Sequence, residues 1–163
     1  MRLYFYNIPM MSGISISPGL IRRLQAAYPE IVAGVKDTSM KAETMRAYNE
    51  VPNLRVFVGT EKLLLANLRA GGAGTIAAFA NVGAMQLQNL VGHWRESDAE
   101  DLQTAVDQRG KVFEGLSTIS TLKAIIEAQT GDPGWRTLRP PLRTLEDEQR
   151  VAAAAAWSQT RIA

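Results

Sequence analysis

Cysteine is absent from the 163-residue sequence, and histidine occurs once, as His93. Without cysteine the chain can form no disulfide, thiol nucleophile or thiolate metal site. A single histidine excludes a histidine-cluster zinc site, and no G-x-S-x-G motif is present to provide a serine nucleophile for it. Catalytic chemistry must therefore come from lysine, tyrosine, carboxylate or hydroxyl side chains. We interpret His93 as a polar residue on an amphipathic helix.

Long apolar runs are also missing, since no segment approaches the ~18 residues that a membrane-spanning helix needs. The first residues, MRLYFYNIP, lack the pattern of a secretory signal, which predicts a cytoplasmic protein without a membrane partner. Lysine and arginine number 18 against 16 acidic residues, and the charges are scattered. This charge pattern predicts no nucleic-acid partner.

The share of hydrophobic residues, 46 %, is enough to build a buried core. Before residue 97, apolar segments typical of strands alternate four times with amphipathic segments typical of helices. The strand segments are uninterrupted apolar runs, as in parallel sheets with both faces covered. We predict strands at residues 3–8, 31–36, 54–58 and 73–79, and helices at residues 18–28, 41–50, 61–69 and 87–94.

The pattern changes after Asn81, because only helical periodicity follows. Ser97 and Glu100 have the spacing of a capping box, which predicts the start of a helix. We therefore divide the chain into four βα units in residues 1–96 and a helical region in residues 97–163.

Lys36 is the first candidate catalytic residue. It ends an apolar strand segment, and parallel strands deliver their last residues to the sheet edge where active sites gather. In apolar surroundings the charged form of an amine is disfavoured, which makes the neutral amine available as a nucleophile. The alternative is a strand-end lysine whose stem packs while its ammonium reaches water, and composition alone favours that alternative.

Tyr6 lies near the end of the first predicted strand, and its phenol is a candidate for proton transfer. The alternative is a half-buried core tyrosine. A third interpretation is a binding domain in which Gly71, Gly72 and Gly74 cradle a phosphate. These glycines lead from a helix into a strand, whereas phosphate loops run from a strand into a helix, so we disfavour that interpretation.

Five short motifs occur along the chain in a fixed order: Tyr6-Asn7-Ile8-Pro9, Gly34-Val35-Lys36-Asp37-Thr38, Gly59-Thr60-Glu61, Gly71-Gly72-Ala73-Gly74-Thr75-Ile76 with Ala80-Asn81, and Arg139-Pro140-Pro141-Leu142. In order and spacing they resemble the dihydrodipicolinate synthase/N-acetylneuraminate lyase family over nearly the whole chain. One such motif alone would be weak, but several in order are specific.

The resemblance implies the second half of a (β/α)8 TIM barrel, strands five to eight, with a C-terminal helical extension. It implies a class I aldolase or lyase in which Lys36 forms an imine with pyruvate or another 2-keto acid. Tyr6 is then the proton relay. The covalent lysine imine replaces any metal or organic cofactor.

The resemblance also implies substrate-binding positions. Thr38 and Glu61 match positions that face the variable, hydroxyl-bearing part of the substrate. Ile76 matches a position whose backbone lies near the pyruvoyl end.

Three residues depart from particular branches of the family. Met11 stands where the dihydrodipicolinate synthase branch has an arginine that grips a second carboxylate. Lys62 and Ala78 replace an acidic residue and a serine of the sialic acid lyase branch. These departures count against both branches, and Lys36-Asp37-Thr38 and Ile76-Ala77-Ala78 look more like aldolases that act on 2-keto-3-deoxy sugar acids. The alternatives are the two named branches and a non-catalytic remnant.

A closed barrel of this kind needs eight strands and about 250 residues, twice what this chain offers. The family's first half carries a Gly-x-x-Gly-Glu turn and a hydroxyl pair that bind the pyruvoyl carboxylate. It also carries a tyrosine donated to the relay of a neighbouring subunit. We therefore expect a truncated chain that is weak or inactive alone, or a half-barrel. A half-barrel would act as a homo-oligomer or with a separate N-terminal half.

Overall fold

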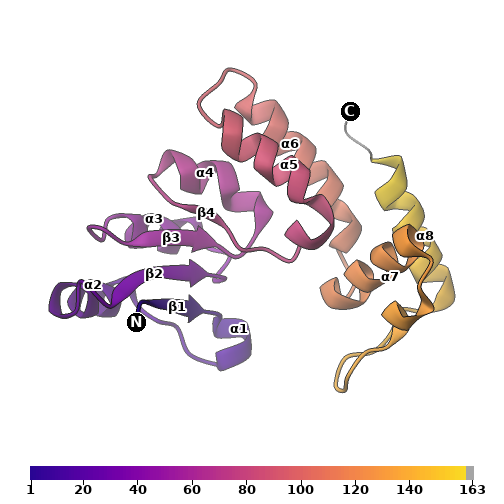
Figure 1. The fold of residues 1–163 in the computed structure, drawn as a ribbon, viewed down its shortest axis with the longest axis horizontal. Coiled ribbons are helices and arrows are strands. Elements are labelled where there is room, and N and C mark those ends of the chain that lie inside the picture. The colour runs from indigo at the N-terminus through magenta and orange to yellow at the C-terminus, as the bar shows by residue number, and fades with distance from the viewer. Residues whose placement is uncertain (161–163) are drawn as a thin grey trace.

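Four parallel strands form a single sheet in the computed structural model, which describes residues 1–160 (Figure 1). The strands lie in the order β1-β2-β3-β4, and helical segments follow each of them. The α/β class and the four βα units predicted from the sequence are confirmed. The strands are β1 (Leu3–Asn7), β2 (Val32–Asp37), β3 (Arg55–Val58) and β4 (Gly74–Thr75).

Strand β4 is much shorter than the predicted strand at residues 73–79. Its neighbour β3 ends at Val58, whose carbonyl accepts a hydrogen bond from the Ile76 N–H at 2.9 Å. Beyond this point the chain has no strand to pair with, and it turns into the next helix.

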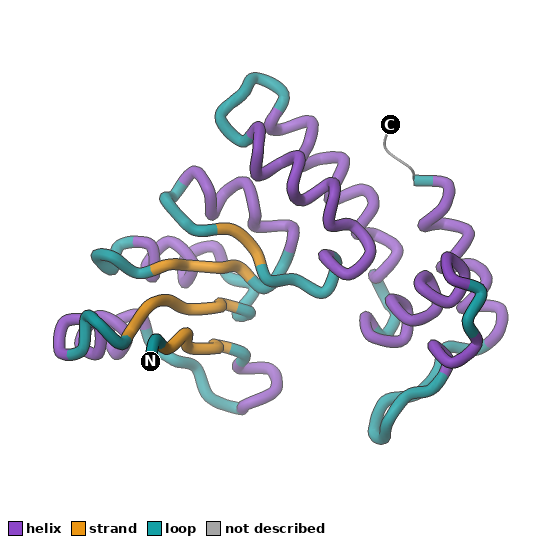
Figure 2. Tube along the Cα trace, viewed as in Figure 1, coloured by secondary structure: helices purple, strands orange, loops and turns teal. Residues whose placement is uncertain are grey.

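Helices cover one face of the sheet (Figure 2). The helix predicted at residues 18–28 begins at Pro18 as expected. The Ser17 hydroxyl accepts a hydrogen bond from the Leu20 N–H at 3.1 Å, and Pro18 follows it. Side chains from strands and helices form a buried cluster on this face: Ile21, Val32, Val35, Tyr48, Val51, Leu54 and Val56. The elements in this part are α1 (Pro9–Ser12), α2 (Pro18–Ala27), α3 (Ala42–Asn49), η1 (Glu61–Leu63), α4 (Leu64–Arg69) and α5 (Ala80–His93).

The opposite face of the sheet is open in the described part of the chain. Tyr4 and Tyr6 of β1 are 45 % and 47 % exposed there. Tyr4 contacts Phe57 of β3, with ring centroids 6.0 Å apart, so these side chains share that face. The sequence predicted cover on both faces, and in residues 1–160 helices cover only one.

The remaining helices form the C-terminal region: α6 (Ala99–Gly110), η2 (Lys111–Phe113), α7 (Thr118–Thr130), η3 (Pro133–Arg136) and α8 (Asp147–Gln159). The predicted capping box of Ser97 and Glu100 is wrong. The residue that caps α6 is Asp98, without a side-chain hydrogen bond, and the Glu100 carboxylate forms an ion pair with Arg69 of α4. No helix within residues 1–160 is long and apolar enough to cross a membrane.

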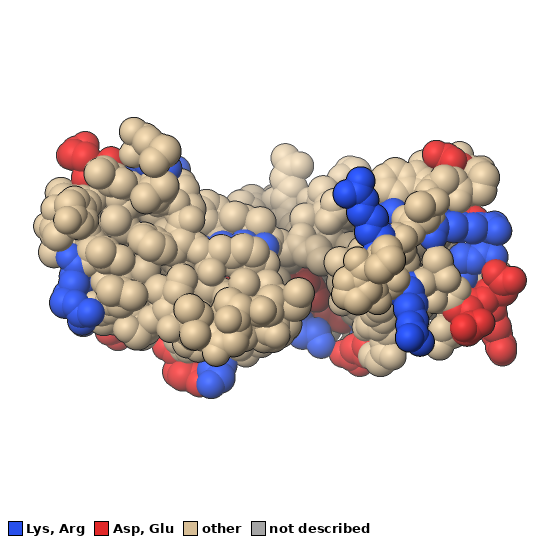
Figure 3. Space-filling model, turned by 90° about the horizontal axis from the view of Figure 1, so that it is seen from below, with Lys and Arg blue, Asp and Glu red and all other residues tan. Residues whose placement is uncertain are grey.

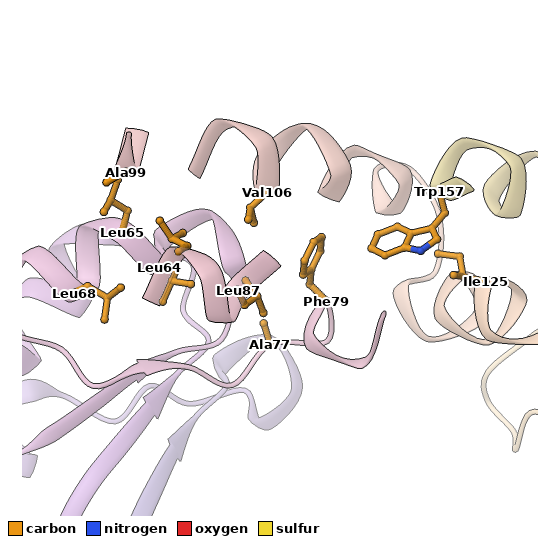
Figure 4. Close-up of a cluster of buried hydrophobic side chains, with 11 residues drawn as sticks. Leu64, Leu65, Leu68, Ala77, Phe79, Leu87, Ala99, Val106, Ile125 and Trp157 are labelled. Atoms are coloured by element: carbon orange, nitrogen blue, oxygen red, sulfur yellow. The ribbon is translucent and has the colours of Figure 1, made fainter. Parts of the chain in front are cut away.

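One hydrophobic cluster joins the sheet region to the C-terminal helices (Figure 4). At its centre the rings of Phe79 and Trp157 pack edge to face with centroids 5.6 Å apart. Its buried members come from both sides of residue 96: Leu64, Leu65, Leu68, Ala77, Phe79, Leu87, Leu90, Ala99, Val106, Ile125 and Trp157.

Candidate active site

Lys36 and Tyr6 meet at the carboxyl ends of the first two strands. They are register partners between β2 and β1, so their side chains point to the same open face of the sheet. The Lys36 Nζ lies 4.0 Å from the centroid of the Tyr6 ring. The ring face attracts the ammonium, which brings an amine and a phenol together at one point.

This contact changes the acidity of the phenol. Burial raises the pKa of Tyr6, but the interactions with Lys36 and Thr38 and the positive charge of Lys36 together outweigh it, so the pKa lies below the ordinary value of tyrosine. The Thr38 Oγ1 is buried and forms no hydrogen bond of normal geometry within residues 1–160. Its interaction with Tyr6 is therefore looser than a well-formed hydrogen bond.

Two glycines make room for the site. A Cβ at Gly59 would lie 2.1 Å from the Thr38 Oγ1, so a side chain there would displace Thr38. A Cβ at Gly34 would lie 2.5 Å from the Tyr4 ring, which packs over the strand at this point. The Arg55 backbone oxygen would lie still closer to a Cβ at Gly34, at 2.3 Å, so close approach requires glycine at both positions.

Thr38 joins Lys36 and Tyr6, but Glu61 does not. The Glu61 carboxylate is directed at α6, where a Cβ on Gly110 would lie 3.1 Å from its Oε1. Burial raises the pKa of Glu61, and the charge of Asp107 on the same helix adds to this effect. Glu61, which the resemblance matched to a substrate-facing position, thus packs against the C-terminal region.

Ile76 and Met11 lie at opposite edges of the sheet. Ile76 follows β4 and is 48 % exposed, and Met11 follows β1 on α1 and is 79 % exposed. Lys36, Tyr6 and Thr38 are thus the predicted residues that the structure brings together.

The glycine segment offers no phosphate cradle. The N–H groups of Gly71, Gly72 and Ala73 already donate to protein carbonyls, at 3.1, 2.7 and 2.8 Å. His93 is exposed on α5, and its Nδ1 lies 2.9 Å from the Asn89 carbonyl oxygen. Within the described residues, no three histidine or acidic side chains gather as potential metal ligands.

Sequence reasoning assigned no role to Asn7 and Asp37, the residues that follow Tyr6 and Lys36. The Asn7 Nδ2 donates to the Asp37 Oδ1 at 2.8 Å, and both residues are buried behind the site. The available signal was alternation: each residue points to the helix-covered face, where an apolar side chain is the norm.

Three comparisons place this geometry among known proteins. The model of the dihydrodipicolinate synthetase family matches residues 2–160. An uncharacterized DapA-like lyase from Halobacterium salinarum is 31 % identical over 158 residues, which are 94 % of this chain and 50 % of that protein. The dihydrodipicolinate synthase from Agrobacterium tumefaciens is 26 % identical, with a TM-score of 0.83 over 98 % of this chain and 54 % of that one.

A further solved structure shares the fold. It is a prophage protein of the dihydrodipicolinic acid synthase family from E. coli K12, in complex with pyruvate. It is 23 % identical, with a TM-score of 0.86 over 98 % of this chain and 56 % of that one. The chain thus spans about half the length of the relatives it matches.

Proposed function

Because the chain belongs to the dihydrodipicolinate synthetase family, we propose that it carries the imine-forming lysine and the proton-transferring tyrosine of a 2-keto acid lyase. The observation that carries the proposal is the contact of the Lys36 Nζ with the Tyr6 ring at the carboxyl ends of two parallel strands. Such a reaction needs an amine as the nucleophile and a phenol of lowered pKa for proton transfer.

In the proposed reaction, the neutral Lys36 amine attacks the ketone carbon of the substrate, and water leaves as the imine forms and is protonated. The bond to be broken joins the carbon next to the imine carbon to a carbon that carries a hydroxyl, and the Tyr6 phenolate removes the proton of that hydroxyl. That carbon–carbon bond then breaks, an aldehyde leaves, and the electron pair moves into the iminium to give an enamine. Tyr6 returns the proton to the enamine carbon, and water hydrolyses the imine to release pyruvate and Lys36.

The lowered pKa of Tyr6 supports its part in this sequence. Proton transfer is most efficient when the pKa of the group lies near the working pH. A phenol whose pKa is lowered by a neighbouring ammonium is closer to that range than an isolated tyrosine.

We propose a 2-keto-3-deoxy sugar acid as the substrate class. The Thr38 hydroxyl lies beside Tyr6 but is buried, so it would contact the hydroxylated part of such a molecule only after turning toward the open face. Met11 carries no charge for a second substrate carboxylate, which argues against the dihydrodipicolinate synthase branch. Glu61 would contact substrate only after turning away from α6. The lysine imine takes the place of a cofactor.

We further propose that β1–β4 correspond to strands five to eight of a (β/α)8 barrel and that residues 97–163 extend it. The Leu3 N–H and the Asn7 carbonyl both bond toward β2, at 2.7 Å each. The backbone groups of Tyr4 and Tyr6 alternate with these and point to the unpaired edge of the sheet. A second four-stranded unit, from another copy or a separate chain, would pair with that edge. A separate N-terminal half would also supply the carboxylate-binding residues, whereas a second copy of this chain would not.

The surface around this edge fits such a partner. Figure 3 shows a broad uncharged area over the sheet part of the molecule, whereas charged side chains gather over the C-terminal helices. Large apolar side chains next to β1 are strongly exposed: Met10 67 %, Met11 79 % and Ile14 70 %. Such a concentration is typical of an interface.

Imine trapping tests the proposal. The purified chain is incubated with pyruvate and borohydride, digested, and searched for the reduced adduct by mass spectrometry, alone and at increasing protein concentration. We expect the adduct on Lys36, its loss in Lys36→Ala, and its retention in Lys41→Ala, which removes a surface lysine of the following turn. Labelling spread over surface lysines at every concentration would contradict the proposal and favour a non-catalytic remnant.

A further inference from the structure

Asn7 and Asp37 form the next rung of the sheet beyond Tyr6 and Lys36. They are register partners between β1 and β2, just as Tyr6 and Lys36 are. Successive side chains point to opposite faces, so this rung lies directly behind the site. Asn7 is 1 % exposed and Asp37 is 3 % exposed.

The Asn7 amide is fixed from both sides. Its Nδ2 donates to the Asp37 Oδ1 at 2.8 Å, and its Oδ1 accepts from the Ile16 N–H at 3.0 Å. The Tyr48 hydroxyl in turn donates to the Ile16 carbonyl. The end of β1 is thereby tied to β2 and, through the loop that precedes α2, to α3.

The Asp37 carboxylate also holds the turn that follows β2. Its Oδ1 accepts from the Ser39 N–H at 3.0 Å, and its Oδ2 accepts from the Ser39 hydroxyl at 2.9 Å. The residue enclosed by this turn is Thr38, whose hydroxyl lies beside Tyr6. The Asp37 carboxylate thus holds both the cross-strand pair with Asn7 and the turn that contains Thr38.

A buried carboxylate of this kind is an expensive way to join two strands. Within residues 1–160 no lysine or arginine forms an ion pair with Asp37, so neutral donors alone stabilise its charge. An apolar pair would fill the same space at lower cost. The polar pair gives instead a directional constraint on the relative position of the strands.

Strand β1 needs such a constraint. It is an edge strand, and its register with β2 is irregular between Leu3 and Tyr4. The other end of β1 carries Tyr6, for which a misplacement of about 1 Å can cost about a hundredfold in rate.

We propose that Asn7 and Asp37 are positioning residues that fix Tyr6 against Lys36 by locking the ends of β1 and β2. The proposal rests on the proposed function for its catalytic meaning, while the geometric claim can be measured separately. Neither residue touches the open face, so both act through Tyr6 and Lys36.

The first measurement is the pKa of the Tyr6 phenol, obtained from ultraviolet titrations of each variant with and without Tyr6→Phe. Asn7→Ala removes the cross-strand bond without changing any charge, and we expect the pKa of Tyr6 to rise toward the ordinary value of tyrosine. The exchange variant Asn7→Asp with Asp37→Asn rebuilds an amide–carboxylate pair and should return the pKa close to that of the parent. Trp157→Ala, which disturbs the remote core, should leave it unchanged.

The second measurement is the rate of imine trapping with pyruvate. We expect a loss of about tenfold in Asn7→Ala and recovery in the exchange variant. If the parent traps no imine while the pKa of Tyr6 responds as described, the proposed function fails and the positioning role stands. A folded Asn7→Ala variant with an unchanged pKa of Tyr6 overturns the positioning role.

If Asn7→Ala does not fold, the pKa of Tyr6 is measured in Ser39→Ala instead. It removes one hydrogen bond from Asp37 and leaves both strands intact, so a smaller rise in the pKa of Tyr6 is expected. An unchanged pKa in that variant would likewise refute the proposal.

Discussion

The Lys36 Nζ lies over the ring of Tyr6, and the two residues face each other across adjacent parallel strands. The pair occupies the open face of the sheet, where Tyr6 remains 47 % exposed. The interaction with Lys36 nevertheless contributes to a pKa of Tyr6 below the ordinary value. Lys36 and Tyr6 thus interact even though the face of the sheet on which they lie is open.

Lys36→Met should raise the pKa of Tyr6 above its value in the parent. The substitution removes the close contact of the Lys36 Nζ and its positive charge, which lower this pKa, and leaves the opposing effect of burial. Ultraviolet titration measures the change, with Tyr6→Phe identifying the signal. Lys41→Met is the matched control, and an equal shift in both variants would show a general charge effect instead.

Thr38→Val should leave the free energy of unfolding unchanged or raise it by up to ~1 kcal/mol, because Oγ1 is buried without a well-formed hydrogen bond. The pKa of Tyr6 should rise slightly, since Thr38 contributes to lowering it. Urea denaturation and the same titration check both effects. A loss of several kcal/mol would mean that the hydroxyl is well bonded after all.

Glu61→Gln should stabilise the chain at neutral pH. Burial raises the pKa of Glu61 in the folded state above its unfolded value, so the folded state binds more protons. This carboxyl therefore lowers stability as pH rises from its unfolded pKa through its folded pKa. We expect a gain of about 0.5 kcal/mol at pH 7, limited by solvent screening, and no gain at pH 4. Urea denaturation at both values, with Glu43→Gln as control, decides the matter.

Glu127→Gln should weaken the loss of stability in acid. A hydrogen bond from Arg136, together with the charges of Arg136 and Arg150, lowers the pKa of Glu127 despite some desolvation. The stabilisation is present above the unfolded pKa and is lost as pH falls through the folded pKa. The fall in melting temperature between pH 7 and pH 3 should be smaller in the variant. Glu148→Gln, an exposed acid on α8, should behave as the parent does.

The sequence was most informative where local patterns decide the structure. Uninterrupted apolar runs identified the strands, and a hydroxyl before Pro18 identified the start of α2. Lys36 and Tyr6 could be assigned to one sheet edge because each lies near the end of a predicted strand.

Strand register and helix packing could not be predicted from local sequence patterns. The pairing of Asn7 with Asp37 joins positions thirty residues apart and depends on the alignment of two strands. The orientation of Glu61 depends on α6, which follows much later in the chain. β4 is short because β3 ends at Val58, a limit that belongs to the partner strand.

The contact between Phe79 and Trp157 has a consequence for recombination between relatives. Phe79 precedes α5 and Trp157 lies in α8, so a crossover near residue 96 would combine rings that were not selected to fit each other. Both rings are nearly fully buried, and buried rings tolerate little change in shape. Chimaeras should therefore inherit residues 64–157 from one parent, with junctions placed ahead of α4.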